Sequence, residues 1–277
     1  MIDSTKQITS AGVVFHAIGR EPLAAGGRAT LLLHGIGANG AAFAPFMERI
    51  VLGGTTLAWD MPGYGGSSPL PMDWPVARDY AKAAVDAARA MNIPRLIIVG
   101  HSLGCLVAGA IAADFPALVD RVAFVSPALG MRTSVGAPLP PPAQSRIDDF
   151  DRLGAAGVAK ARAPLLLAPA NRTAEQISRV EAGLMALRMP GYGQATRMLA
   201  SGDLIADASR ISAPALVITG TEDAITPPKG GDLLAAALNA RPGLAHRRHV
   251  LLPGTGHMPF DEAAAELAAA LADFLCS

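Results

Sequence analysis

An apolar run, Ile97 to Val99, leads directly into Gly100-His101-Ser102-Leu103-Gly104, and a helical apolar pattern follows at once. This order predicts a strand, a sharp turn and a helix, with Ser102 in a strained backbone conformation and its hydroxyl projecting above a sheet. Glycines at 100 and 104 fit such a turn, because a Cβ atom at either position would collide with the neighbouring strand or helix. This feature constrains the fold more than any other in the chain.

Strand-like and helical patterns alternate along the rest of the chain. Short β-rich runs occupy residues 29–34, 55–59, 95–99, 121–126, 215–219 and 249–252, and a run at 12–17 predicts a leading antiparallel strand. Helical patterns occupy residues 41–50, 76–91, 103–115, 230–239 and 261–275. Because each crossover is long enough to carry a helix, the pattern predicts βαβ units and a mostly parallel sheet flanked by helices.

The segment 129–207 breaks this alternation. It opens with a cluster of prolines, continues as helical stretches punctuated by further prolines, and contains no convincing strand. We expect a helical cap inserted between the two halves of an α/β core, residues 1–128 and 208–277, and a long linker is the alternative. A chain of 277 residues, 51% of them hydrophobic, has enough apolar material for one core with an insertion.

The charge balance and the cysteine content exclude several classes of protein. Lys plus Arg and Asp plus Glu each number 23, and no long basic run occurs, so we expect a small-molecule substrate and neither nucleic acid nor a membrane as partner. The start lacks the pattern of a secretion signal, and no segment has the apolar length of a membrane span. Cys105 and Cys276 are too few for a disulfide framework or a metal site. We expect a cytoplasmic protein and leave its oligomeric state open.

A serine hydroxyl needs a base to become a good nucleophile near neutral pH, and six histidines are available. His257 is favoured because it lies in a glycine-rich loop between the last strand and the last helix, at the carboxyl edge of the predicted sheet. We expect His34 to pack beside the loop that it introduces and His101 to point away from Ser102. The remaining histidines are expected on an edge strand or in a solvated basic patch: His16, His246 and His249.

An acidic residue is needed to orient that imidazole. The predicted strand 215–219 ends shortly before Asp223, at the same sheet edge as Ser102 and His257. The Asp223 carboxylate would accept a hydrogen bond from one ring nitrogen of His257 and leave the other nitrogen facing Ser102. Glu222 is the neighbouring competitor, and we expect it to face outwards.

Cleavage of an acyl bond also requires N–H donors aimed at the developing oxyanion. We expect one from Leu103, which follows the serine, and one from the loop His34-Gly35-Ile36-Gly37-Ala38-Asn39-Gly40 after the strand 29–34. Glycines let this loop turn its amides inward, and Ile36 is the preferred donor. A simple tight turn is the alternative interpretation of the loop.

Five motifs in this order resemble the α/β-hydrolase superfamily: His34-Gly35, Asp60 to Ser67, Gly100 to Gly104, Gly220 to Pro227, and Gly256-His257. The resemblance spans nearly the whole chain and implies the α/β-hydrolase fold, with an eight-stranded type of sheet that is mostly parallel. It also implies a triad of Ser102, Asp223 and His257 and an oxyanion hole at Ile36 and Leu103. The chain order serine, aspartate, histidine is the one expected for this fold.

Smaller features bear on the branch of the superfamily. The cap length and the stretches 189–192, 202–204 and 213–214 are similar to the 3-oxoadipate enol-lactonase group. Ser102 departs from the dehalogenase and epoxide-hydrolase branches, which are known for an aspartate there. The proline-iminopeptidase signature His-Gly-Gly-Pro-Gly is absent, which weakens a peptidase interpretation.

These features predict a serine hydrolase that cleaves a small carboxylic ester or lactone through an acyl-enzyme, with no metal or organic cofactor. The alternatives are a carbon–carbon bond hydrolase of a ring-cleavage product or an amide hydrolase, in degradation of aromatic compounds, and a hydrolase-fold ligand receptor. Specificity in this architecture comes from the cap and loops, so the substrate stays open. Most cap arginines are expected to be solvated, but one would pair with the carboxylate of an acidic substrate. The candidates include Arg132, Arg162, Arg179, Arg188 and Arg197.

Overall fold

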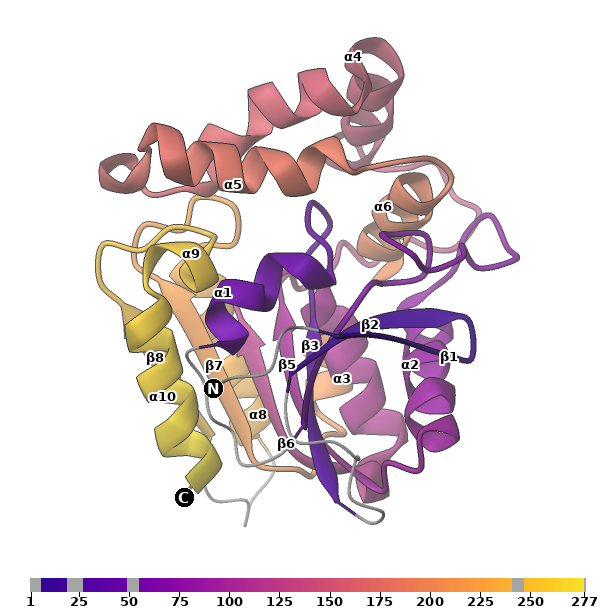
Figure 1. The fold of residues 1–277 in the computed structure, drawn as a ribbon, viewed down its shortest axis with the longest axis vertical. Coiled ribbons are helices and arrows are strands. Elements are labelled where there is room, and N and C mark those ends of the chain that lie inside the picture. Colours follow the sequence, from indigo (N-terminus) through magenta and orange to yellow (C-terminus); the bar gives the residue numbers. More distant parts are fainter. Residues whose placement is uncertain (1–5, 19–26, 49–54, 241–246, 277) are drawn as a thin grey trace.

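The computed structural model describes residues 6–18, 27–48, 55–240 and 247–276. An eight-stranded sheet lies between two layers of helices (Figure 1). Its strands are β1 (Lys6–Ser10), β2 (Val13–Ile18), β3 (Arg28–Leu33), β4 (Thr55–Trp59), β5 (Arg95–His101), β6 (Val119–Val125), β7 (Ala215–Gly220) and β8 (Arg247–Leu252). In the order β1-β2-β4-β3-β5-β6-β7-β8, the pairs β1/β2 and β2/β4 are antiparallel and all others are parallel. The predicted α/β fold class is confirmed.

Apolar side chains on both faces of the central strands hold these layers together. Leu31 and Leu33 of β3 join the core beneath α2, α3 and α8, whereas Leu32 points the other way and packs with residues of α1 and α10. A strand that is buried on both faces reads as a continuous apolar run, which is what the sequence shows here. The helices are α1 (Ala44–Met47), α2 (Ala77–Ala90), α3 (Gly104–Asp114), α8 (Pro228–Asn239), α9 (Pro259–Glu262) and α10 (Ala264–Cys276).

Several predicted elements differ from the observed ones. All seven predicted strands occur within two residues of their expected bounds. The polar strand β1 was not expected, because its mostly exposed residues show no alternation of apolar and polar side chains. The predicted helix 41–50 is a 3₁₀ turn, Gly40–Phe43, followed by the short α1, and residues 49–50 lie outside the described part. The predicted helix 261–275 is interrupted at Ala263, where φ is −142° and the chain passes from α9 to α10.

Two histidines expected to be solvated are instead packed and hydrogen-bonded. His16 lies on β2, which is covered by the outer strand β1, and its Nε2 is 3.2 Å from Asp60 Oδ1. His249 is 10% exposed and lies 2.8 Å from Asp232 Oδ1. Both find carboxylate partners from distant segments, which no local pattern indicates. The prediction for His246 falls outside the described residues.

The segment 129–207 folds as helices α4 (Pro141–Leu166), α5 (Ala174–Met185) and α6 (Gly191–Ser201), with a 3₁₀ turn at Pro169–Asn171. Figure 1 shows α4 and α5 lying across one edge of the sheet. The predicted boundary after residue 207 falls inside α7 (Leu204–Ala208), which packs against α3 and α8. The division into core and cap stays a prediction. Within the described ranges, no helix is both long and apolar enough to cross a membrane.

The turn between β5 and α3 is unusually crowded. Ser102 has a φ of +52°, in the left-handed region that non-glycine residues rarely adopt. A Cβ atom on Gly100 would lie 2.8 Å from the carbonyl oxygen of Gly104, and one on Gly104 would lie 2.7 Å from the carbonyl carbon of Leu33. Both glycines are therefore required by the close approach of backbone segments, and this packing fixes where Ser102 stands.

Replacing Gly104 by alanine tests this packing. The added methyl group would meet backbone atoms of Leu33 and His34, which cannot move without disturbing the sheet, so we expect G104A to lose about 3 kcal/mol of unfolding free energy. The control is G109A on the same helix, where the nearest atom is the end of the Leu204 side chain. That side chain can shift and alanine favours a helix by about 1 kcal/mol over glycine, so G109A should stay within about 1 kcal/mol of the parent. Equal losses in urea denaturation would contradict this account.

Candidate active site

Three side chains from separate loops form one hydrogen-bonded chain at the carboxyl edge of the sheet. Ser102 Oγ lies 2.9 Å from His257 Nε2, and His257 Nδ1 lies 2.9 Å from Asp223 Oδ2 and 3.1 Å from Oδ1. Ser102 follows β5, Asp223 follows β7 and His257 follows β8, so parallel strands that end at one edge deliver all three. All three are at least 93% buried. The carboxylate holds the imidazole so that its other nitrogen can accept the serine proton.

The Asp223 carboxylate is surrounded by donors. The N–H groups of Ile225 and Thr226 donate to Oδ1 at 2.9 and 2.8 Å, and the Thr226 hydroxyl lies 2.8 Å from Oδ2. Burial alone would raise the pKa of Asp223, but the hydrogen bonds from His257 and Thr226 outweigh it and lower the pKa to about 2. The carboxylate is therefore charged at any physiological pH. Glu222 is exposed, as expected of the residue that faces away.

The loop that carries His257 is tied down on both sides. The His257 N–H donates to the carbonyl of Leu166 at 2.8 Å, and His101 Nε2 donates to the carbonyl of His257 at 2.8 Å. The carboxylate of Glu262 accepts from the N–H groups of Gly256 and Met258, one on each side of the histidine, both at 3.0 Å. The backbone of His257 is thus fixed by α4 as well as by the sheet.

Glu262 extends this clamp to the segment after α4. Its Oε2 also accepts from the Ala168 N–H at 2.8 Å and from Asn171 Nδ2 at 2.9 Å. Asn171 Nδ2 in turn donates to the carbonyl of Gly254 at 3.1 Å. One carboxylate therefore joins the histidine loop to residues that follow the helix lying over it.

The loop after β3 runs past the serine. A Cβ atom on Gly35 would lie 3.0 Å from Ser102 Cβ, so this loop touches the turn. The Gly35 carbonyl accepts from His34 Nδ1 at 2.7 Å and from the Ala38 N–H at 3.2 Å. Because the C=O and N–H of a trans peptide point in opposite directions, these bonds fix the direction of the Ile36 N–H. Within the described residues, neither the Ile36 N–H nor the Leu103 N–H donates a hydrogen bond, so both are available to a ligand.

His34 also fixes the neighbouring strand end. Its Nδ1 donates to Gly35 while its Nε2 accepts from the Met61 N–H at 3.0 Å, a pattern that only the neutral imidazole provides. Burial lowers the pKa of His34 to about 4 and, with repulsion from His257, that of His101 to about 3. The neutral imidazole of His101 lies beside the candidate base, with ring centroids 5.2 Å apart.

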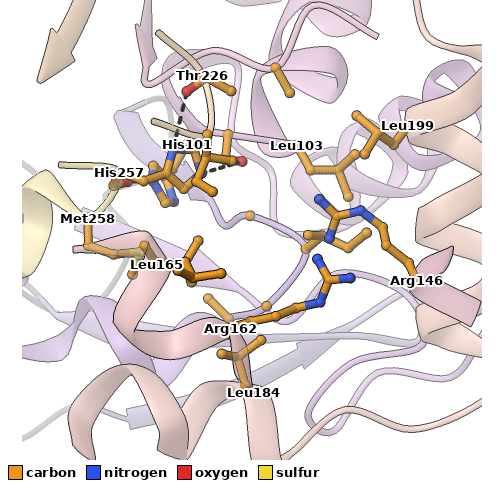
Figure 2. Close-up of a pocket in the computed structure, with 18 of the residues that line it drawn as sticks. His101, Leu103, Arg146, Arg162, Leu165, Leu184, Leu199, Thr226, His257 and Met258 are labelled. Carbon is orange, nitrogen blue, oxygen red and sulfur yellow. Dashed lines mark hydrogen bonds between the residues drawn. The ribbon is translucent and has the colours of Figure 1, made fainter. Parts of the chain in front are cut away.

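A cavity of about 350 Å³ opens above Ser102, between the carboxyl edge of the sheet and helices α4 and α5. Its floor includes Ile36, Ser102, Leu103 and His257. Figure 2 shows Leu165 and Leu184 in its wall, and the guanidinium groups of Arg146 and Arg162 on the side away from His257. The remaining apolar lining includes Ala128, Leu129, Met131, Val180, Leu199 and Met258. The enclosure suits a small, mainly hydrocarbon ligand.

The structure brings every predicted site residue to this cavity or to its immediate support. Ser102 and His257 line it, Asp223 lies behind His257, and Ile36 and Leu103 line it beside the serine. Sequence reasoning missed Thr226 and Glu262. Thr226 had a weak local signal, because a hydroxyl three residues after an aspartate in a turn commonly bonds back to it. Two donors to Glu262, the N–H groups of Gly256 and Met258, are close to it in the sequence, but the other two come from Ala168 and Asn171, which only the fold brings near.

Comparisons with known proteins agree on one family. The model of the alpha/beta hydrolase family matches residues 30–270. An (E)-2-((N-methylformamido)methylene)succinate hydrolase of Acinetobacter baylyi is 31% identical over 201 residues, which cover 71% of this chain and 73% of the relative. A pimeloyl-[acyl-carrier protein] methyl ester esterase of Xanthomonas campestris pv. campestris is 30% identical over 272 residues, 91% of this chain and 96% of the relative. An enol-lactonase from Burkholderia xenovorans LB400 superposes with a TM-score of 0.84 at 22% identity, covering 98% of this chain and 100% of that one, and so shares the fold.

The neutral state of His101 predicts a pH dependence of stability. Its pKa is about 3 in the folded protein and about 6.5 in an unfolded chain, so between these values only the unfolded state binds the proton. Stability that is fully present above pH 6.5 is then lost as pH falls, at about 1.4 kcal/mol per unit for this residue. H101Q, whose amide can still donate to the His257 carbonyl, should lose less stability than the parent between pH 5.5 and 4.5, by about 1.4 kcal/mol. Identical pH slopes in urea denaturation would contradict the burial of a neutral His101.

Proposed function

Because the chain belongs to the alpha/beta hydrolase family, we propose that it is a serine hydrolase that cleaves a small carboxylic ester or lactone through an acyl-enzyme intermediate. The observation that carries the proposal is the chain of hydrogen bonds from Ser102 through His257 to Asp223, which ends at the floor of a largely apolar cavity. In a largely apolar cavity the fixed dipoles of the protein interact more strongly with a developing charge than they would in water.

In the first step, His257 Nε2 takes the proton of the Ser102 hydroxyl as Oγ attacks the carbonyl carbon of the substrate. The carbonyl oxygen becomes an oxyanion and accepts hydrogen bonds from the N–H groups of Ile36 and Leu103. The charged Asp223 stabilises the imidazolium that forms. His257 then gives its proton to the leaving oxygen, the bond to that oxygen breaks, and the acyl group stays on Ser102.

In the second step, His257 takes a proton from a water molecule, and the water oxygen attacks the acyl carbon. The second tetrahedral intermediate collapses, Ser102 Oγ recovers its proton from His257, and the acid product leaves. For a lactone the leaving oxygen remains part of the same product. We further propose that residues 129–207 act as a cap, since α4 and α5 supply the wall of the cavity that faces Ser102.

An amide-type substrate is the second candidate, because the name of the Acinetobacter relative carries a formamido group. The same residues would protonate a nitrogen in place of an oxygen. Comparing a phenyl ester with the matching anilide separates the two, and a vinylogous diketone tests carbon–carbon cleavage. A ligand receptor on this fold would show a single turnover without release of product.

Replacing Ser102 by alanine tests the central proposal. S102A should lower kcat for p-nitrophenyl butyrate by about 10³-fold or more, because the nucleophile is removed while the cavity stays intact. Circular dichroism and the melting temperature should match those of the parent. A fluorophosphonate should form one adduct at Ser102, and S209A, which changes an exposed serine, should leave both labelling and turnover intact. Retention of more than a tenth of the activity in S102A would overturn the proposal.

A further inference from the structure

The cavity above Ser102 carries positive charge and no negative charge. Arg146 and Arg162 are the charged side chains among the described residues that line it, and no carboxylate does so. Figure 2 shows both side chains extending from α4 into the cavity. Both are half-buried, and most of the surrounding wall is apolar. Two like charges in a poorly solvated enclosure repel each other, and a bound anion would offset this repulsion.

The protein itself neutralises this pair only in part. Arg162 lies 3.3 Å from Asp149 Oδ2, but the other oxygen of Asp149 lies 2.7 Å from Arg152, so one carboxylate is shared between two guanidinium groups. Arg146 makes no hydrogen bond and no ion pair within the part of the chain that the structure describes. The N–H groups of its guanidinium are therefore available to a ligand in the cavity.

A break in α4 brings the two arginines to the same cavity. They are sixteen residues apart, and a straight helix with a rise of about 1.5 Å per residue would separate them by about 24 Å, far more than the width of a cavity of about 350 Å³. Between them, Gly154 has φ +62° and ψ 179°, a conformation that is essentially confined to glycine. No atom lies within 4 Å of the position that a Cβ would take there. Glycine is needed at 154 for the backbone conformation alone, and that conformation kinks the helix.

We propose that Arg146 and Arg162, placed together by the break at Gly154, bind a carboxylate of the substrate. The inference rests on the proposed function, because the carboxylate would belong to the same molecule whose ester or lactone bond meets Ser102. A guanidinium group can bind both oxygens of a carboxylate through two parallel N–H donors. It therefore fits a carboxylate better than a lysine ammonium group, which acts as a point charge. The apolar wall between the arginines and the serine accommodates a short hydrocarbon chain. The substrate class is therefore a short acid that carries a carboxylate at one end and the scissile acyl bond at the other.

Matched esters test the proposal. The mono-p-nitrophenyl ester of glutaric acid carries the carboxylate, and p-nitrophenyl valerate has the same chain length without it. The parent enzyme should prefer the glutarate ester in kcat/KM by at least about tenfold, and R146Q should lower this preference by about 10- to 100-fold, chiefly through KM, as expected for one charge-assisted hydrogen-bonded contact. R179Q is the control, because Arg179 pairs with Glu175 on α5 and does not line the cavity. It should leave both rates unchanged.

G154A tests placement separately from charge. It keeps both arginines but forbids the backbone conformation of Gly154, so the preference for the glutarate ester should fall while the turnover of valerate persists. Its melting temperature shows whether the variant is folded, and R146Q provides the same test without backbone strain. Equal losses on both esters in R146Q, or no preference in the parent, would overturn the assignment.

Direct binding separates this inference from the proposed function. Calorimetry with glutarate should detect binding to the parent and to S102A, and binding at least about tenfold weaker to R146Q. Glutarate binding of this kind without turnover of either ester would refute the proposed function and support the anion site. Equal affinity for inorganic phosphate would refute the assignment to a carboxylate.

Discussion

Helix α3 meets the end of strand β3 at Gly104 so closely that no Cβ atom fits between them, and the rest of the site depends on this approach. Because α3 begins directly after the turn, the contact holds Ser102 in the left-handed region and beside the loop that carries Ile36. The strain of that conformation is offset by burial of α3, whose residues 104–112 are all buried against the sheet and its neighbouring helices. A serine in an open turn would relax out of this conformation. The packing of the core therefore fixes the geometry of the site.

His257 depends on contacts from both sides of the cavity. Asp223 and His101 reach it from the sheet, whereas the Leu166 carbonyl comes from the end of α4 and Glu262 links its loop to Ala168 and Asn171. Burial keeps His101 and His34 neutral, so neither adds a positive charge that would oppose formation of an imidazolium at His257. A displacement of the segment after α4 would break hydrogen bonds to the backbone of the histidine loop. The wall of the cavity and the orientation of the imidazole are therefore mechanically coupled.

Much of the fold was predictable because the central strands are apolar runs bounded by glycine or proline, and their number and order follow from the alternation with helices. The polar β1 was missed because an exposed edge strand has no such pattern. Ser102, Asp223 and His257 were predictable because each lies in a distinctive loop just after a strand, and a parallel sheet brings such loops to one edge. The partners of His16 and His249 were not, since their carboxylates come from distant segments. The link from Glu262 to Ala168 and Asn171 was missed for the same reason.

Arg146 shows most clearly what local patterns cannot supply. Arg162 is one of several arginines in the predicted cap, but nothing in the sequence indicates that Arg146 shares a cavity with it. An isolated glycine in a helical pattern, such as Gly154, usually predicts only a weaker helix. The balance of 23 basic and 23 acidic residues predicts no excess of positive or negative electrostatic potential. That balance describes the whole chain, whereas the field inside a cavity depends on which side chains line the same apolar enclosure. Here Asp149 contacts Arg162 but does not line the cavity, so a chain of zero net charge places two arginines and no carboxylate in the lining of the cavity above Ser102.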